Sequence, residues 1–118
     1  MSDRELLELA AKAAGVSITR WMKHNEAFLI PDMKEGIGAT WNPLTDDGDA
    51  LRLAIKLGMS LRLAQFDEWT QVFVDDLYYR AAKPITEHTG RTSPTQTIEQ
   101  ATRRAITRAA AEIGRAMP

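Results

Sequence analysis

The feature that most constrains the fold is segment 41–54, in which the sequence turns from a loop into a helix. It opens with Trp41, a bulky apolar side chain suited to anchoring a loop, and Asn42-Pro43 then interrupts regular structure. Three carboxylates follow where the unsatisfied N–H groups of a helix start attract negative charge. They are Asp46, Asp47 and Asp49. The pattern predicts a loop that ends at a helix N-terminus.

The helix that begins here should run from Thr45 or Asp46 to Leu57, and Gly58 can supply the left-handed residue that ends it. Apolar residues recur along this segment at helical spacing. We expect its inward side to consist of Leu51, Ala54 and Ile55, flanked by Leu53 and Leu57.

The N-terminal segment predicts another helix, over about residues 3–14, started by a Ser2–Glu5 capping box and ended by Gly15. Part of it recurs later in the chain. Leu7, Leu9, Ala10 and Lys12 recur in the same order as Leu51, Leu53, Ala54 and Lys56. Segment 15–18 recurs as segment 58–61, at a spacing that is one residue shorter. A duplicated helix–glycine–strand unit explains this echo, and so does the shared chemistry of helix ends.

A third helix is predicted near the C-terminus. Ser93-Pro94-Thr95-Gln96 forms a capping box with proline at the first helical position, and the helix should cover about 95–115. Small apolar residues dominate its expected inner stripe, which would let it lie close to a sheet. The stripe is Ile98, Ala101, Ala105, Ala109 and Ile113, with Ile106, Ala110 and Met117 beside it.

β-forming residues between the helices predict two hairpins. The first covers 16–30 and turns at His24-Asn25-Glu26. In the second, alternating polar and apolar residues over 60–64 pair with 69–75, and Asp67-Glu68 turns the chain.

Two segments rich in glycine, proline or threonine predict loops. Segment 31–40 is expected to be mostly loop, with room for a short strand near 37–41, and segment 81–95 is expected to be long and exposed. The predicted order is αββ–αββ–α. The length of 118 residues suits a single domain, 1–118. The predicted fold class is α+β, a three-layer α-β-α sandwich with a mainly antiparallel sheet of about four strands.

Composition excludes several kinds of protein. The net charge of −1 provides no overall field that would attract nucleic acid or an anionic membrane, and no apolar run approaches a membrane span. The absence of cysteine excludes disulfides and thiolate chemistry. His24 and His88 have no companions at zinc-ligand spacing and no nucleophile motif beside them. We therefore predict no catalytic residues, no metal site and no cofactor.

The first candidate site is the loop and helix start already described. Its ligand-binding residues would be Trp41, Asn42, Asp46, Asp47 and Asp49. Carboxylate oxygens are ligands that hard cations prefer, but the spacing matches no calcium loop. Helix capping already explains carboxylates at this position, and we expect capping to be their main role.

The second candidate site is the basic C-terminal helix, because residues 91–118 carry five basic and two acidic side chains. Its outer side holds Arg103, Arg104, Arg108 and Arg115. These arginines could contact the phosphates of a nucleic acid. The alternative is a solvated face with acidic partners one turn away, and no recognised nucleic-acid motif accompanies the arginines.

Two stretches, 41–54 and 101–114, together resemble the phage ABA sandwich domain family. With the hairpins between them, the resemblance covers most of the chain. A more distant similarity is to the NinX-type phage proteins, which pair a Trp-Asn-Pro-like loop with a Thr-Pro-started final helix. The family implies an α–β–α layered sandwich and a phage or prophage origin. It implies no catalytic residues.

The sequence therefore predicts an accessory protein of phage origin, without catalytic activity, acting in the cytoplasm of the infected or lysogenic host. Its expected partner is a protein of the host or the phage, with nucleic acid a less favoured partner and no membrane association. One alternative is a small-ligand or metal-binding protein or enzyme that uses the loop from Trp41 to Asp49. Another is a nucleic-acid binder that uses the arginines of the last helix.

Overall fold

The computed structural model describes residues 2–23, 26–30, 39–65, 69–76, 85–90 and 96–118. These residues form an α+β structure in which three helices are separated by two groups of three antiparallel strands. The elements are α1 (Asp3–Ala14), β1 (Arg20–Met22), β2 (Ala27–Ile30), β3 (Ala39–Trp41), α2 (Asp47–Leu57), β4 (Met59–Gln65), β5 (Trp69–Asp76), β6 (Ile85–Gly90) and α3 (Ile98–Ala116).

Helices α1 and α2 begin and end as their sequences predict. The Ser2 side chain accepts from the Glu5 N–H at the start of α1, and the Asp46 side chain accepts from the Asp49 N–H at the start of α2. Gly15 and Gly58 end the two helices with φ of 68° and 65°, a conformation that costs glycine little because it lacks a Cβ.

The predicted inward side of α2 is wrong for two of its residues. Leu51 is 56% exposed and Ile55 is 69% exposed, whereas the buried residues are Ala50, Leu53, Ala54 and Leu57. Both stripes have helical spacing and both contain leucine, so periodicity alone could not distinguish them. A shift of one residue turns a helix by about 100°, which is enough to move Leu51 and Ile55 from the predicted inner stripe to the surface.

Helix α3 begins later than its predicted capping box. Thr97 is the N-cap, and Thr97 and Gln100 form the reciprocal capping box, while residues 93–95 lie outside the described residues. Ile98 is 37% exposed because it is the first helical residue, but Ala101, Ala105, Ala109 and Ile113 are buried as predicted.

The strands confirm both predicted hairpins and add strands to each. β1 pairs with β2, and β4 pairs with β5, both antiparallel; residues 24, 25 and 66–68 of the predicted turns lie outside the described residues. β3 confirms the short strand near 37–41. β6 corrects the long loop predicted over 81–95, because residues 85–90 pair with β5. Threonine is common in both loops and strands, so composition misled the prediction.

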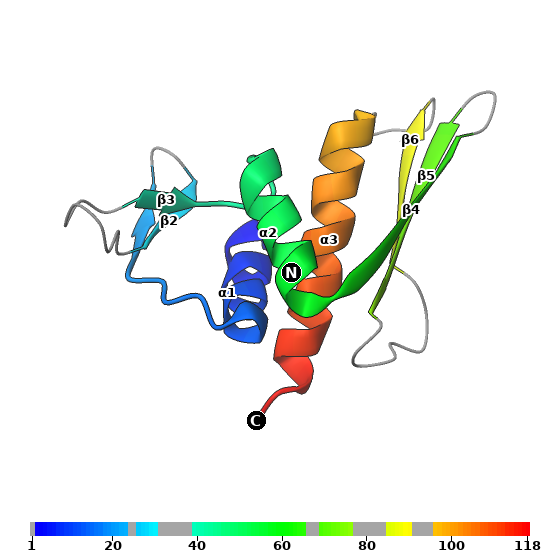
Figure 1. Cartoon of the computed structure of the whole chain (residues 1–118). Helices are drawn as coiled ribbons and strands as arrows, with labels where there is room; N and C mark the ends of the chain where they lie inside the picture. Colours follow the sequence, from blue (N-terminus) through cyan, green and yellow to red (C-terminus); the bar gives the residue numbers. More distant parts are fainter. Residues whose placement is uncertain (1, 24–25, 31–38, 66–68, 77–84, 91–95) are drawn as a thin grey trace.

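The described strands form two three-stranded sheets, β1-β2-β3 and β4-β5-β6, where a single sheet of about four strands was expected. Figure 1 shows the helices between the two sheets, with β1–β3 on one side and β4–β6 on the other. The described residues are thus layered sheet, helices, sheet, and not helix, sheet, helix. Among these residues, no helix is both long and apolar enough to cross a bilayer.

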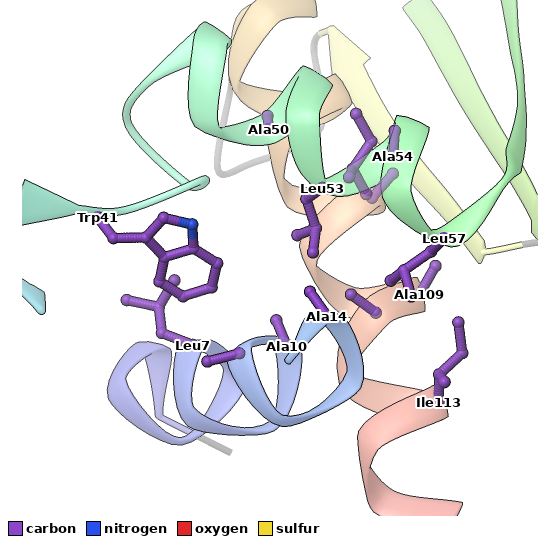
Figure 2. Packing of buried hydrophobic residues seen from close by; sticks show 14 of the residues in the cluster. Leu7, Ala10, Ala14, Trp41, Ala50, Leu53, Ala54, Leu57, Ala109 and Ile113 are labelled. Atoms are coloured by element: carbon purple, nitrogen blue, oxygen red, sulfur yellow. The ribbon is translucent and has the colours of Figure 1, made fainter. Parts of the chain in front are cut away.

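The core lies where α1 and α2 pack on α3 (Figure 2), and the first sheet adds an aromatic row to it. Trp21 stands opposite Phe28, and Phe28 opposite Trp41, in neighbouring strands. The Trp21 and Phe28 rings meet edge to face with centroids 4.9 Å apart. Phe28 and Trp41 are buried, so this row ties the small sheet to the helices.

Helices α1 and α2 bury the same pattern of positions against the core. The equivalent pairs are Leu7–Ala50, Ala10–Leu53, Ala11–Ala54 and Ala14–Leu57, followed by Gly15–Gly58, all 43 residues apart. The echo seen in the sequence pairs Leu7 with Leu51, which are 44 residues apart, and this matches a buried residue with an exposed one. The structural equivalence therefore has a spacing of 43.

Candidate functional site

Asn42 is the centre of the loop that was predicted as a ligand site. It is 6% exposed. Its side-chain amide donates to the Glu26 carbonyl, and its side-chain oxygen accepts from the Leu44 N–H at 2.8 Å. Its backbone carbonyl accepts from the Asp46 N–H at 3.0 Å. Asn42 therefore joins the start of β2 to the start of α2, and its polar groups are used inside the fold.

The aspartates of this loop also have partners. Asp49 accepts from the Asn42 N–H at 3.0 Å through Oδ2 and from Arg52 at 2.8 Å through Oδ1. Asp46 caps α2 by accepting from the Asp49 N–H at 2.8 Å. Within the described part of the chain, no group of three or more metal-ligating side chains is present. The arrangement is that of a helix cap.

Arg103 connects the two candidate sites that the sequence treated as separate. Its side chain is 16% exposed, donates from Nε to the Leu44 carbonyl at 2.9 Å, and contacts Asp47 Oδ1 through Nη1 at 2.6 Å. It therefore fastens the loop before α2 to the second turn of α3. Its acidic partner, Asp47, lies on α2. A solvated face would instead pair the arginine with an acid one turn away on α3.

The other predicted arginines also contact acids of the chain. Arg104 pairs with Asp3 at 2.9 Å and lies 3.6 Å from Glu87, and Arg108 pairs with Glu87 at 2.9 Å. Arg115 pairs with Glu112 at 3.3 Å, one turn away on α3. Glu87 belongs to β6 and its side chain is 15% exposed. It therefore links the second sheet to α3, a role that the sequence did not indicate because β6 was not predicted.

Two large apolar side chains are exposed on the outside of α2. Leu51 and Ile55 are four residues apart, so their side chains lie next to each other on the helix. We call this pair the α2 ridge. Its equivalents on α1, at the spacing of 43, are Glu8 and Lys12, which are also exposed but are charged. The fold thus exposes both pairs of positions, and only α2 fills them with large apolar side chains.

His88 lies in β6, opposite Gln71 of β5, and His24 lies outside the described residues.

Comparison with known proteins identifies no relative: no family model, no curated protein and no solved structure matches this chain.

Proposed function

We propose that this protein is a non-catalytic accessory protein that binds another protein of its phage or host through the α2 ridge. The observation that carries the proposal is the exposure of Leu51 and Ile55, at 56% and 69%, on a helix whose structural equivalent places charges there. The phage or prophage origin, and action in the cytoplasm of the infected or lysogenic host, belong to the same proposal and rest on the two motifs of the resemblance.

Burial of the ridge by a partner would be favourable. Complete burial of a leucine or isoleucine side chain contributes about 1.5–3 kcal/mol relative to leaving it in water. A pair of such side chains acts as an anchor within a larger contact, since a few residues supply most of the binding energy in protein interfaces. Because exposure of these two apolar side chains to water is unfavourable, we would expect charged residues at positions 51 and 55 if no partner covered them.

The contacts at the two other candidate sites favour this proposal over its alternatives. A ligand or metal at the loop would compete with the hydrogen bonds that already occupy Asp46 and Asp49. A nucleic acid on α3 would compete with Asp47 and Glu87 for Arg103 and Arg108. Each exchange would lose an existing charge contact for every new one.

The test is affinity capture from infected host cells with three forms of the chain, followed by mass spectrometry. The variant Leu51→Glu/Ile55→Lys places the α1 residues on the α2 ridge. The control Glu8→Ala/Lys12→Ala changes the equivalent positions of α1. We expect a protein that is captured by the native chain and by the control, but lost with the ridge variant.

Equal capture by all three forms would remove the ridge from the proposal. The nucleic-acid alternative would replace protein binding if nucleic acid is recovered and its affinity falls steeply with salt. That affinity should then also fall when Arg104 or Arg108 is removed.

A further inference from the structure

A cavity of about 380 Å³ lies on the side of α2 next to the first sheet. Its walls are the end of α1, the strands β2 and β3, and α2. The apolar part of the lining comes from Val16, Ile30, Trp41 and Leu53. Figure 2 shows Trp41 and Leu53 reaching the same region above α1 from the loop and from α2.

The charged groups of the cavity come from α2 and have a net positive charge. Arg52, Lys56 and Asp49 line it together. Both oxygens of Asp49 already accept, one from Arg52 and one from the Asn42 N–H, so this carboxylate is compensated inside the protein. Arg52 also lies 3.8 Å from Asp46. The arginine therefore has acidic neighbours of its own.

Lys56 is the charge that remains for a ligand. Among the described residues it forms no ion pair, and its Nζ lies 4.0 Å from where a Cβ on Gly15 would be. The ammonium thus lies beside Gly15 at the C-terminal end of α1, at the edge of the apolar lining. A small anion bound in the cavity would meet this ammonium at one end and apolar side chains along its length.

We infer that this cavity binds a small molecule with an apolar body and a single carboxylate. Ligand pockets are typically about 300–1,000 Å³ and mostly apolar, with few polar groups that fix orientation, and this cavity is at the small end of that range. A volume of this size suits a medium-chain or monocyclic carboxylic acid. A cationic ligand is disfavoured because Asp49 is already occupied.

This inference is independent of the α2 ridge, because Leu51 and Ile55 do not line the cavity. It also differs from a ligand site centred on the aspartates of the loop. Trp41 contributes a wall and Asp49 holds Arg52 in place, while Lys56, Val16 and Ile30 supply contacts that the sequence did not suggest.

The experiment is titration of the full chain with three probes of equal chain length: octanoate, octanol and octylammonium. Binding is followed by calorimetry and by amide chemical shifts. We expect one saturable site for octanoate, weaker binding of octanol, and none of octylammonium. Shifts should concentrate at Val16, Ile30, Thr40 and Lys56. Equal binding of octanoate and octylammonium, or shifts elsewhere in the chain, would overturn the inference.

Two variants and one control locate the site. Lys56→Gln should weaken octanoate binding about fivefold, as expected for a partly exposed ion pair, and leave octanol binding unchanged. Thr40→Trp should abolish binding of both, because it fills the cavity from an exposed strand position. Lys23→Gln, an exposed lysine outside this cavity, should change nothing. If Thr40→Trp does not fold, the shift map of the native chain decides by itself.

Discussion

Helices α1 and α2 share their inner surface and differ in their outer one. Each buries four residues at equivalent positions, and each ends at a left-handed glycine 43 residues from the other. At the equivalent exposed positions, α1 has Glu8 and Lys12 where α2 has Leu51 and Ile55. The shared interior reflects what packing on α3 requires. The outer residues are not constrained in this way, so their difference is where function is to be sought.

The two helices are also attached to α3 in different ways. At Gly114, a Cβ would lie 2.0 Å from the Leu9 carbonyl oxygen, so α1 and α3 approach backbone to backbone. α2 instead depends on side chains, including the contacts of Arg103 with Leu44 and Asp47. α1 is thus held by close steric fit, and the start of α2 by a polar contact. Five predictions test this comparison.

The largest effect should come from the buried stripe of α2. Leu53→Ala removes a side chain that is 3% exposed and should lower the free energy of unfolding by about 2–5 kcal/mol, because it leaves a cavity. Leu51→Ala, two residues away, should stay within about 0.5 kcal/mol. Chemical denaturation of both variants measures the difference. A larger loss for Leu51→Ala than for Leu53→Ala would mean that the two sides of α2 have been exchanged.

The close approach of α1 to α3 predicts the next effect. Gly114→Ala should lower the free energy of unfolding by about 1–3 kcal/mol, since the new methyl group must push apart two backbones. This loss would occur although alanine is the better helix former by about 1 kcal/mol. Thermal unfolding measures it. A stabilised variant would show that α1 does not approach α3 so closely.

Arg103 should matter more than the other arginines of α3. Arg103→Ala leaves the Leu44 carbonyl without its donor and should cost about 1–3 kcal/mol. Arg115→Ala breaks an exposed pair and should cost about 0–1 kcal/mol. Urea unfolding of the two variants compares them, and equal small costs would return Arg103 to a simple solvated face.

The helix caps should be equivalent on the two helices. Ser2→Ala and Asp46→Ala each remove a side chain that accepts a first-turn N–H, and each should cost about 1 kcal/mol. Asp46→Asn keeps an accepting oxygen and is the matched control, with little expected change. The chain should still fold in all three variants. A much larger loss for Asp46→Ala than for Ser2→Ala would indicate a second role for that carboxylate.

The smallest effect on stability is expected for the variant that tests the proposed function. Leu51→Glu/Ile55→Lys gives α2 the outer residues of α1, and should change the free energy of unfolding by no more than about 0.5 kcal/mol, because both side chains are exposed. Denaturation curves of this variant and the native chain should therefore overlap. A clear loss of stability would mean that the ridge is covered within the fold.

Local signals in the sequence predicted the caps and ends of α1 and α2 and both hairpins, because those features depend on neighbouring residues. The start of α3 and strand β6 were predicted poorly. Two capping-type sequences lie close together before α3. The loop-like composition of segment 85–90 did not suggest that this segment forms a strand paired with β5. Of the candidate site residues, Trp41 is buried, as suits the loop anchor that the sequence indicated, and Asp46 caps α2 as expected.

The sequence by itself determined that three segments of the chain form helices and where α1 and α2 end, since capping hydrogen bonds and left-handed glycines are local. Only the tertiary structure decided which side of α2 is buried, because two apolar stripes have the same periodicity and contact with α3 selects one. It also decided the partners of the arginines. Asp47 and Glu87 are 56 and 21 residues away from Arg103 and Arg108, and only packing brings these charges together.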